Sequence, residues 1–165
     1  MLFRWQRRSK IGAERIVRRS RSRGRTGLSR YAGDFRPDID GRSLRVEYAP
    51  HPDGLPDPGE VVWTWVPFEE DPAQGKDRPV LIIGRDGPLL LGLMLTSKDH
   101  DRDVAAQAEH GRHWLDIGTG AWDGQRRPSE VRLDRILRLR SDEVRREGAA
   151  LSREVFDRVA QALKG

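Results

Sequence analysis

Apolar residues along this chain concentrate in short runs between residues 60 and 140, and polar turns interrupt them. Short runs rich in Val, Ile, Leu and Trp are typical of β-strands, because branched and aromatic side chains pack well on a pleated surface. Turn residues stand at 86–88 and 118–124, and turns of this kind join antiparallel neighbours. We therefore predict a meandering antiparallel sheet with strands at 60–68, 79–84, 89–96, 112–117, 131–134 and 136–140.

The final segment of the chain follows a different period. Its apolar residues recur three and four positions apart, which is the spacing of one helix face, and Ser152 stands where an N-cap residue is expected. We predict a C-terminal amphipathic helix that covers the sheet, with an apolar stripe of Val155, Phe156, Val159, Ala160 and Leu163. A short helix over 101–110 is a further prediction, although its stripe consists only of Val104, Ala105 and Ala108.

The first part of the chain differs in composition from the rest. Residues 1–45 contain 14 Lys or Arg and 4 acids, a balance of +10, whereas residues 46–165 contain 17 and 22, a balance of −5. Residues 1–45 also carry few large apolar side chains to offset the entropy lost on folding. Residues 50–59 hold four prolines and two glycines, which form a turn-rich connector. We therefore expect residues 1–57 to be a basic, largely disordered arm and linker, and residues 58–165 to be the folded domain.

The basic arm permits two interpretations. Its arginines, together with Leu2, Phe3 and Trp5, suit RNA or an anionic lipid surface, and a solvated tail is the plainer alternative. The arm lacks the apolar stretch of a secretory signal, and no run reaches the roughly 18 apolar residues of a membrane span. The chain has 165 residues and no cysteine. We therefore expect one domain with an extension, in the cytoplasm.

Several familiar site patterns are incomplete in this chain. His110 and His113 stand three apart at a strand boundary, without the carboxylates of a metal site. The run 118–124 is rich in glycine like a dinucleotide loop, but it has neither the spacing nor the flanking strand and helix. Walker and nucleophile-elbow motifs do not occur in the sequence. We therefore expect neither a metal ion nor an organic cofactor.

Arginine, carboxylate and hydroxyl groups at strand ends are the remaining candidate chemistry. The two-residue period of a strand puts Arg132 and Asp134 on one face, roughly 7 Å apart. Arg78 precedes a proline, which favours an extended backbone and so fixes the direction of its side chain. Thr96 and Ser97 end an aliphatic strand. The alternative interpretation is a surface ion pair, an edge arginine and a turn, which are all common.

Four segments, in this order, resemble the motifs of the PemK/MazF toxins of type II toxin-antitoxin systems. They are 58–63 (Pro-Gly-Glu-Val-Val-Trp), 74–83 (Gln-Gly-Lys-Asp-Arg-Pro-Val-Leu-Ile-Ile), 95–97 (Leu-Thr-Ser) and 131–134 (Val-Arg-Leu-Asp). The resemblance covers about residues 58–163, and the ordered combination is much more specific than any single piece. It implies a mainly β fold with some helix, in which twisted antiparallel strands form an SH3-like barrel with a C-terminal helix, and usually a homodimer.

The resemblance also implies an activity. Family members are metal-independent endoribonucleases that cut single-stranded RNA, including mRNA, and a cognate antitoxin, which also binds DNA with the toxin, neutralises them. Matched by motif, the catalytic residues are Arg78, Thr96, Ser97, Arg132 and Asp134. Asp134 would accept the proton of the attacking 2′-hydroxyl, the arginines would stabilise the developing charge, and the hydroxyls would hold a phosphate oxygen or the 2′-hydroxyl. The general acid stays unassigned.

Two other functions remain open on the same barrel. One is a non-catalytic module that binds RNA or an antitoxin, with the basic arm supplying most of the affinity. The other is a barrel that acts on a protein target.

The sequence departs from the family pattern in one motif: the stretch 71–74 lacks a histidine that some family members carry before the Arg-Pro step. Acidic segments at 69–71 and 99–101 repel phosphate at short range and would instead face an antitoxin or solvent.

Four tryptophans lie within the expected domain, at positions 63, 65, 114 and 122. They could stack RNA bases, but indoles in apolar strands more often belong to a core or a dimer interface. We expect Trp63 in the core and Trp122, in its glycine-rich loop, to be the more exposed ring.

Overall fold

The computed structural model describes residues 31–37, 41–97, 104–109, 111–145 and 149–165 of the chain. Its strands are β1 (Asp34–Phe35), β2 (Val61–Pro67), β3 (Gly75–Asp86), β4 (Leu89–Thr96), β5 (Trp114–Gly118), β6 (Ser129–Arg132) and β7 (Ile136–Leu139). The helical elements are α3 (Val104–Glu109), the short 3-10 helix η3 (Ser141–Glu143) and α4 (Arg153–Lys164). The fold is mainly β with a C-terminal helix, as the strand-like runs and the family resemblance predicted.

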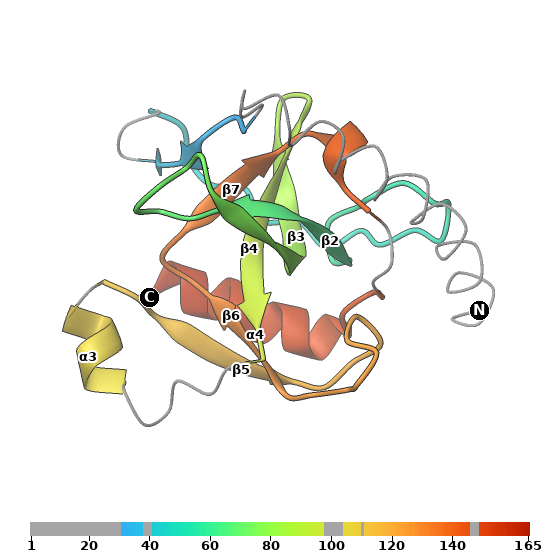
Figure 1. Cartoon of the computed structure of the whole chain (residues 1–165). Coiled ribbons are helices and arrows are strands. Elements are labelled where there is room, and N and C mark those ends of the chain that lie inside the picture. The colour runs from blue at the N-terminus through green and yellow to red at the C-terminus, as the bar shows by residue number, and fades with distance from the viewer. Residues whose placement is uncertain (1–30, 38–40, 98–103, 110, 146–148) are drawn as a thin grey trace.

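All strand pairs are antiparallel, and β4 lies at the centre of the sheet (Figure 1). The main strand order is β1-β7-β4-β3-β2, while β6 pairs with the end of β4 and β5 pairs with β6. β4 can serve three neighbours because its first half pairs with β7 and its last two residues pair with β6. Between the described residues, these pairings form an open curved sheet and do not close into a ring.

The sheet is buried on both faces, which the aliphatic run of β3 shows most clearly. Val80, Leu81, Ile82 and Ile83 are all fully buried. Successive side chains of a strand point to opposite faces, so a continuous apolar run indicates two covered faces. Leu81 and Ile83 belong to the cluster that packs against α4, whereas Val80 and Ile82 belong to a second cluster on the other face. Each face of the sheet therefore has its own hydrophobic core.

The C-terminal helix α4 begins after Ser152, whose side chain accepts a hydrogen bond from the Val155 backbone N–H at 3.3 Å. Phe156 and Val159 are buried in the first core cluster, one turn apart on the same helix face. Figure 1 shows α4 lying across the sheet beside β5 and β6. This confirms the prediction of a capped amphipathic helix over the sheet. The short helix α3 confirms the prediction of a helix within 101–110, at least over its described residues.

Residues 31–37 and 41–57 pack on the domain, which differs from the disordered arm and linker expected for 1–57. Phe35 in β1 is 4% exposed and pairs with Ile136 of β7. Leu44, Val46 and Tyr48 lie against the core that contains α4. Their spacing of two residues is the sequence signal of a strand-like segment with one buried face, and it offsets the local excess of charge. Residues 1–30, with most of the expected arm, lie outside the described residues.

The turn-rich segment at 50–59 is held by Glu60, which is 1% exposed. The Glu60 carboxylate accepts hydrogen bonds from the backbone N–H groups of His51 and Asp57, each at 3.1 Å. Burial raises the pKa of Glu60 to about 7, although these hydrogen bonds oppose the shift. The Asp57 carboxylate in turn binds Arg85 of β3 at 3.0 Å. Hydrogen bonds to Glu60 and the ion pair with Arg85 therefore fix the proline-rich segment against the domain.

The expectation for the tryptophans was wrong at Trp122. This ring is 5% exposed, because it packs into the core of the α4 face and donates a hydrogen bond from Nε1 to Ser129 Oγ at 3.0 Å. Trp63 is half-buried, and its Nε1 donates to the Trp122 carbonyl at 2.8 Å. The Trp65 side chain is 38% exposed, more than those of Trp63 and Trp122. A glycine-rich loop can therefore fold back and bury its aromatic residue.

Candidate functional site

Arg78 lies in the first half of β3, before the aliphatic run that fills the core. The following proline keeps the backbone extended, and Arg78 pairs with Thr64 of β2. Two residues further along the strand, Val80 belongs to the second core cluster. Since side chains two apart share a face, Arg78 projects on the sheet face opposite α4. Its side chain is half-buried at the edge of that core.

The Arg78 guanidinium has an unusual environment. Within the part of the chain that the structure describes, no acceptor forms a hydrogen bond or ion pair with it. Burial lowers its pKa, and the positive charge of nearby Arg135 lowers it further. A partly desolvated cation without a counter-ion is unfavourable, so this position favours an anion from outside the chain.

The pairing register brings Thr96 to the same face as Arg78. Val80 pairs with Met94, and Arg78 and Thr96 each lie two residues beyond this last pair, on the same face of their strands. Thr96 is half-buried at the end of β4 and pairs with Glu130 of β6. Its hydroxyl therefore lies at the end of the sheet where Arg78 lies. Ser97 follows the strand and is exposed.

Arg132 and Asp134 are in direct contact. Arg132 is 6% exposed, and its Nε and Nη2 donate to the Asp134 carboxylate at 2.7 to 3.1 Å. The strand expected over 131–134 ends at Arg132 in the structure, so Asp134 lies in a bend just after β6. The bend shortens the separation expected for an extended strand and permits a bidentate pair.

Two further groups fix this ion pair. Glu69, from the loop between β2 and β3, binds the Arg132 guanidinium through both of its oxygens at 2.9 and 3.1 Å. The His113 backbone N–H donates to Asp134 at 2.8 Å. Burial raises the pKa of Asp134, but the hydrogen bonds from Arg132 and from His113 outweigh it, and the net pKa lies below its usual value. The same carboxylates raise the pKa of Arg132 against the effect of burial, so both partners stay charged.

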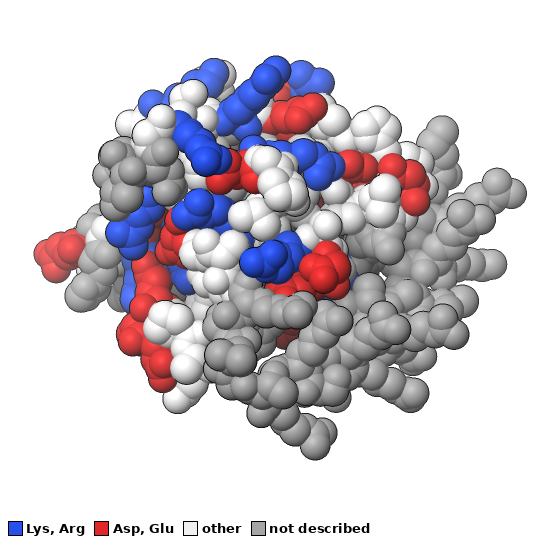
Figure 2. All heavy atoms as spheres, turned by 90° about the horizontal axis from the view of Figure 1, so that it is seen from above, with Lys and Arg blue, Asp and Glu red and all other residues white. Residues whose placement is uncertain are grey.

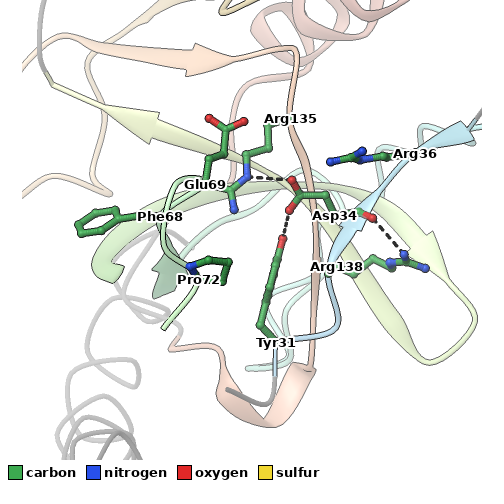
Figure 3. A pocket seen from close by; sticks show the side chains of 9 residues that line it. Tyr31, Asp34, Arg36, Phe68, Glu69, Pro72, Arg135 and Arg138 are labelled. Atoms are coloured by element: carbon green, nitrogen blue, oxygen red, sulfur yellow. Dashed lines mark hydrogen bonds and ion pairs between the residues drawn. The ribbon is translucent and has the colours of Figure 1, made fainter. Parts of the chain in front are cut away.

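An open cleft of about 600 Å³ adjoins these groups (Figure 3). Arg135 lines the cleft; its Nε binds Asp34 at 3.1 Å and its Nη1 donates to the Pro67 carbonyl at 2.9 Å. Glu69 lines the cleft and also binds Arg132, while Arg135 lies close enough to Arg78 to lower its pKa. The cleft therefore connects the two groups of candidate residues.

Sequence reasoning did not assign Arg135 or Glu69 to the site. Glu69 was noted only as part of an acidic segment expected to repel phosphate. The available signal for Arg135 was strand alternation, because residues 135, 137 and 139 share a face and Leu137 and Leu139 belong to the second core cluster. That alternation puts Arg135 on the same face as Arg78.

Charge on the surface is mixed rather than segregated. Figure 2 shows Lys and Arg side chains interleaved with Asp and Glu on the face seen from above. Among the ion pairs are Arg42 with Asp86 and Arg138 with Asp86, the latter at 3.6 Å. Within the described ranges, no group of three or more His, Cys, Asp or Glu side chains is placed to hold a metal ion. His110, one of the two histidines considered as metal ligands, lies outside the described residues.

The chain matches a known protein family. The family described as PemK-like, MazF-like toxin of type II toxin-antitoxin system matches residues 57–165, well over half of the chain. None of the curated proteins compared with the chain matches it. Among the described residues, no helix has both the length and the apolar character needed to cross a membrane.

Proposed function

The chain belongs to the PemK-like and MazF-like toxins of type II toxin-antitoxin systems, and we propose that it acts as an endoribonuclease that cuts single-stranded RNA without a metal ion. Membership in this family implies a cognate antitoxin as a partner. We further propose that the protein works in the cytoplasm as a homodimer, binds DNA together with its antitoxin and arrests growth through cleavage of mRNA.

One observation carries the proposal for the activity: the half-buried Arg78 has no partner among the described residues, and burial and the positive charge of Arg135 lower its pKa. RNA offers a dense series of phosphates, and the charge on a phosphate increases as the phosphorane forms. A guanidinium that is already partly desolvated binds such a group more strongly than one in water. Arg78 is therefore suited to stabilise the transition state of phosphodiester cleavage.

The proposed reaction is an internal transfer of the phosphodiester. The 2′-oxygen forms a bond to phosphorus while the bond from phosphorus to the 5′-oxygen of the next nucleotide breaks, which leaves a cyclic phosphate and a 5′-hydroxyl. One proton leaves the 2′-hydroxyl and one proton is gained by the 5′-oxygen. In this proposal Thr96 or Ser97, its neighbour in sequence, holds a phosphate oxygen or the 2′-hydroxyl by a hydrogen bond.

Asp134 is our candidate for the group that accepts the 2′-hydroxyl proton. In the free protein its lowered pKa keeps it ionised but makes it a weak base. Much of that shift comes from Arg132, so its pKa would rise if Arg132 turned one N–H from Asp134 to a phosphate. The pair therefore offers a base whose strength increases when substrate binds. Arg78, whose pKa is lowered, is our candidate for stabilising the negative charge that develops on the leaving 5′-oxygen.

The decisive experiment compares cleavage by the wild type and by Arg78→Ala. Purified proteins are incubated with a long single-stranded RNA in EDTA, and the new ends are mapped. Wild type should give discrete cuts with cyclic or 3′-phosphate ends, and the variant should be about a hundredfold to a thousandfold slower, as for loss of one transition-state donor.

The matched control is Arg158→Ala, which removes an exposed arginine from α4 on the opposite side of the sheet. It should cleave like the wild type. Equal cleavage by the wild type and Arg78→Ala would contradict the assignment of Arg78. Salt-dependent RNA binding without any cut products would instead favour the non-catalytic RNA-binding module.

A further inference from the structure

The cleft beside Arg135 has one wall that lies outside the segment matched to the toxin family. Tyr31, Gly33, Asp34 and Arg36 line it, and all four precede the matched residues 57–165. The opposite wall comes from the loop between β2 and β3, within the matched segment. We propose that this cleft binds one nucleotide of the RNA adjacent to the cleaved phosphate, and that residues 31–36 give this chain a nucleotide subsite of its own. This inference rests on the proposed function.

The size and shape of the cleft fit a single nucleotide. Its volume of about 600 Å³ lies within the range of roughly 300 to 1,000 Å³ typical of small-ligand sites. It is partly open to solvent, as a site on a continuous strand of RNA must be, and Figure 3 shows the side chains that line it. A nucleotide can therefore enter without the chain ends of the RNA being threaded through the protein.

One side of the cleft is apolar and aromatic. In the view of Figure 3, Phe68, Pro72 and Tyr31 follow one another along this side. The Tyr31 hydroxyl donates to Asp34, and burial, together with this bond, raises the pKa of Tyr31 far above its usual value. Tyr31 therefore stays a neutral, fixed ring. Aromatic side chains such as Phe68 and Tyr31 stack bases without strong sequence preference, because every base has a π-face.

The rest of the cleft is cationic on balance, with three arginines and two carboxylates. Arg135 is bound by Asp34, while Arg36 is exposed and Arg138 donates to the Asp34 carbonyl at 3.0 Å. In the view of Figure 3, Arg36 and Arg138 lie on the side away from Phe68. A nucleotide has the same division, with a flat base at one end and an anionic phosphate at the other. The cleft therefore matches a nucleotide in both parts.

The position of the cleft indicates which nucleotide it would bind. Arg135 lines the cleft and also lies close to Arg78. If Arg78 binds the cleaved phosphate, the neighbouring nucleotide reaches Arg135 and then the aromatic side. An acidic protein segment could use the arginines, but it has no equivalent use for the two aromatic rings of the other side. We therefore assign the cleft to RNA.

The test measures binding of single-stranded DNA octamers, one for each of the four bases, by fluorescence anisotropy. DNA lacks the 2′-hydroxyl and cannot undergo the proposed cleavage, so binding is measured without reaction. Phe68→Ala should weaken binding about tenfold with an unchanged salt dependence, and Phe68→Tyr should restore it. Arg36→Ala should weaken binding and reduce the slope of log K against log salt by about 0.7, as expected when one phosphate fewer is neutralised.

Leu55→Ala and Arg158→Ala are the matched controls, since both side chains are exposed and lie outside the cleft. Equal affinity and equal salt slopes for Phe68→Ala, Arg36→Ala and the wild type would overturn the inference and leave the cleft to a protein ligand. Weaker binding by the two cleft variants supports it even if the wild type cuts no RNA, an outcome in which only the proposed activity fails. With RNA as substrate, Phe68→Ala should also relax the base preference at one position beside the cut.

Discussion

Three arginines on one face of the sheet carry the same charge but differ in what surrounds it. Arg132 is bound by two carboxylates, and Arg135 is bound by Asp34 and a backbone carbonyl. Arg78 has no such partner among the described residues. A guanidinium stays protonated in all three environments, so pairing decides which of them can accept a phosphate at once. Arg78 can bind a phosphate directly, whereas Arg132 must first release one of its carboxylate partners.

Glu60 is a buried carboxylate whose role is structural. It holds the segment at 50–59 through two backbone N–H groups, and it directly precedes β2, at the end opposite the loop that lines the cleft. Its pKa rises from 4.5 to about 7 because burial disfavours its ionised form. The folded state therefore binds this proton more tightly than the unfolded state does. The resulting stabilisation is complete below about pH 4.5 and is lost as the pH rises through about 7.

Replacing Glu60 with Gln should remove this pH dependence. Gln stays neutral and keeps one acceptor oxygen, so it resembles the protonated side chain. Between pH 5 and pH 8 the wild type should lose on the order of 2 to 3 kcal/mol of unfolding free energy relative to Glu60→Gln. Urea denaturation of both proteins at the two pH values measures the difference, and subtraction of the variant removes the contributions of other groups. Parallel pH profiles for the two proteins would contradict this role of Glu60.

At the scale of single residues, sequence reasoning worked where a motif fixed both residue type and spacing. Arg132 and Asp134 were expected as neighbours and are in contact. Glu69 and Arg135 could not be assigned, because their partners lie 63 and 101 positions away in the sequence. The burial of Trp122 was mispredicted for a related reason: loop composition indicates a turn, but only the fold determines whether the ring meets a core.

At the scale of elements, the strands with long apolar runs were predictable, and β1 was not. β4 was predicted over residues 89–96 and occupies Leu89–Thr96, because a turn precedes it and its residues up to Leu95 are large and apolar apart from Gly92. The cap at Ser152 likewise marked the start of α4. β1 has two residues, which is too short to show a period. β1 forms because its backbone pairs with the edge of β7 and because Phe35 is buried in the core.

Phe35 provides a test of whether the segment before residue 57 belongs to the folded unit. Phe35→Ala should lower the free energy of unfolding by about 3 kcal/mol, because it removes a buried ring and leaves a cavity in the core that contains α4. Leu55→Ala, at a side chain that is 61% exposed, should change it by no more than about 0.5 kcal/mol. Chemical denaturation of the two variants measures both values. If Phe35→Ala is as stable as Leu55→Ala, residues 31–37 do not contribute to the core.

At the scale of the whole molecule, the positive charge of the chain is unevenly distributed. Residues 1–30 hold 11 Lys or Arg and one acid, whereas the described domain interleaves both signs on the face shown in Figure 2. The domain alone therefore offers RNA a local cleft with few unpaired cations. The N-terminal residues offer a dense positive charge that attracts any polyanion over a Debye length of about 8 Å. Affinity and chemistry are thus expected from different parts of the sequence.

Deleting residues 1–30 should separate these two contributions. Affinity for single-stranded RNA should fall at least about tenfold near physiological salt, and the salt slope should decrease by about 0.7 for each phosphate that the truncated protein no longer neutralises. The cut positions should not change, because Arg78, Thr96 and the cleft remain. Anisotropy titrations at several salt concentrations measure the first effect, and end mapping at saturating protein measures the second. A full-length variant in which Gln replaces Arg18, Arg19 and Arg21 tests whether the charge of the N-terminal residues, rather than their length, supplies the affinity. Its affinity for single-stranded RNA should also fall. Altered cut positions in the truncated protein would show that residues 1–30 take part in choosing the bond, and the division between affinity and chemistry would then be wrong.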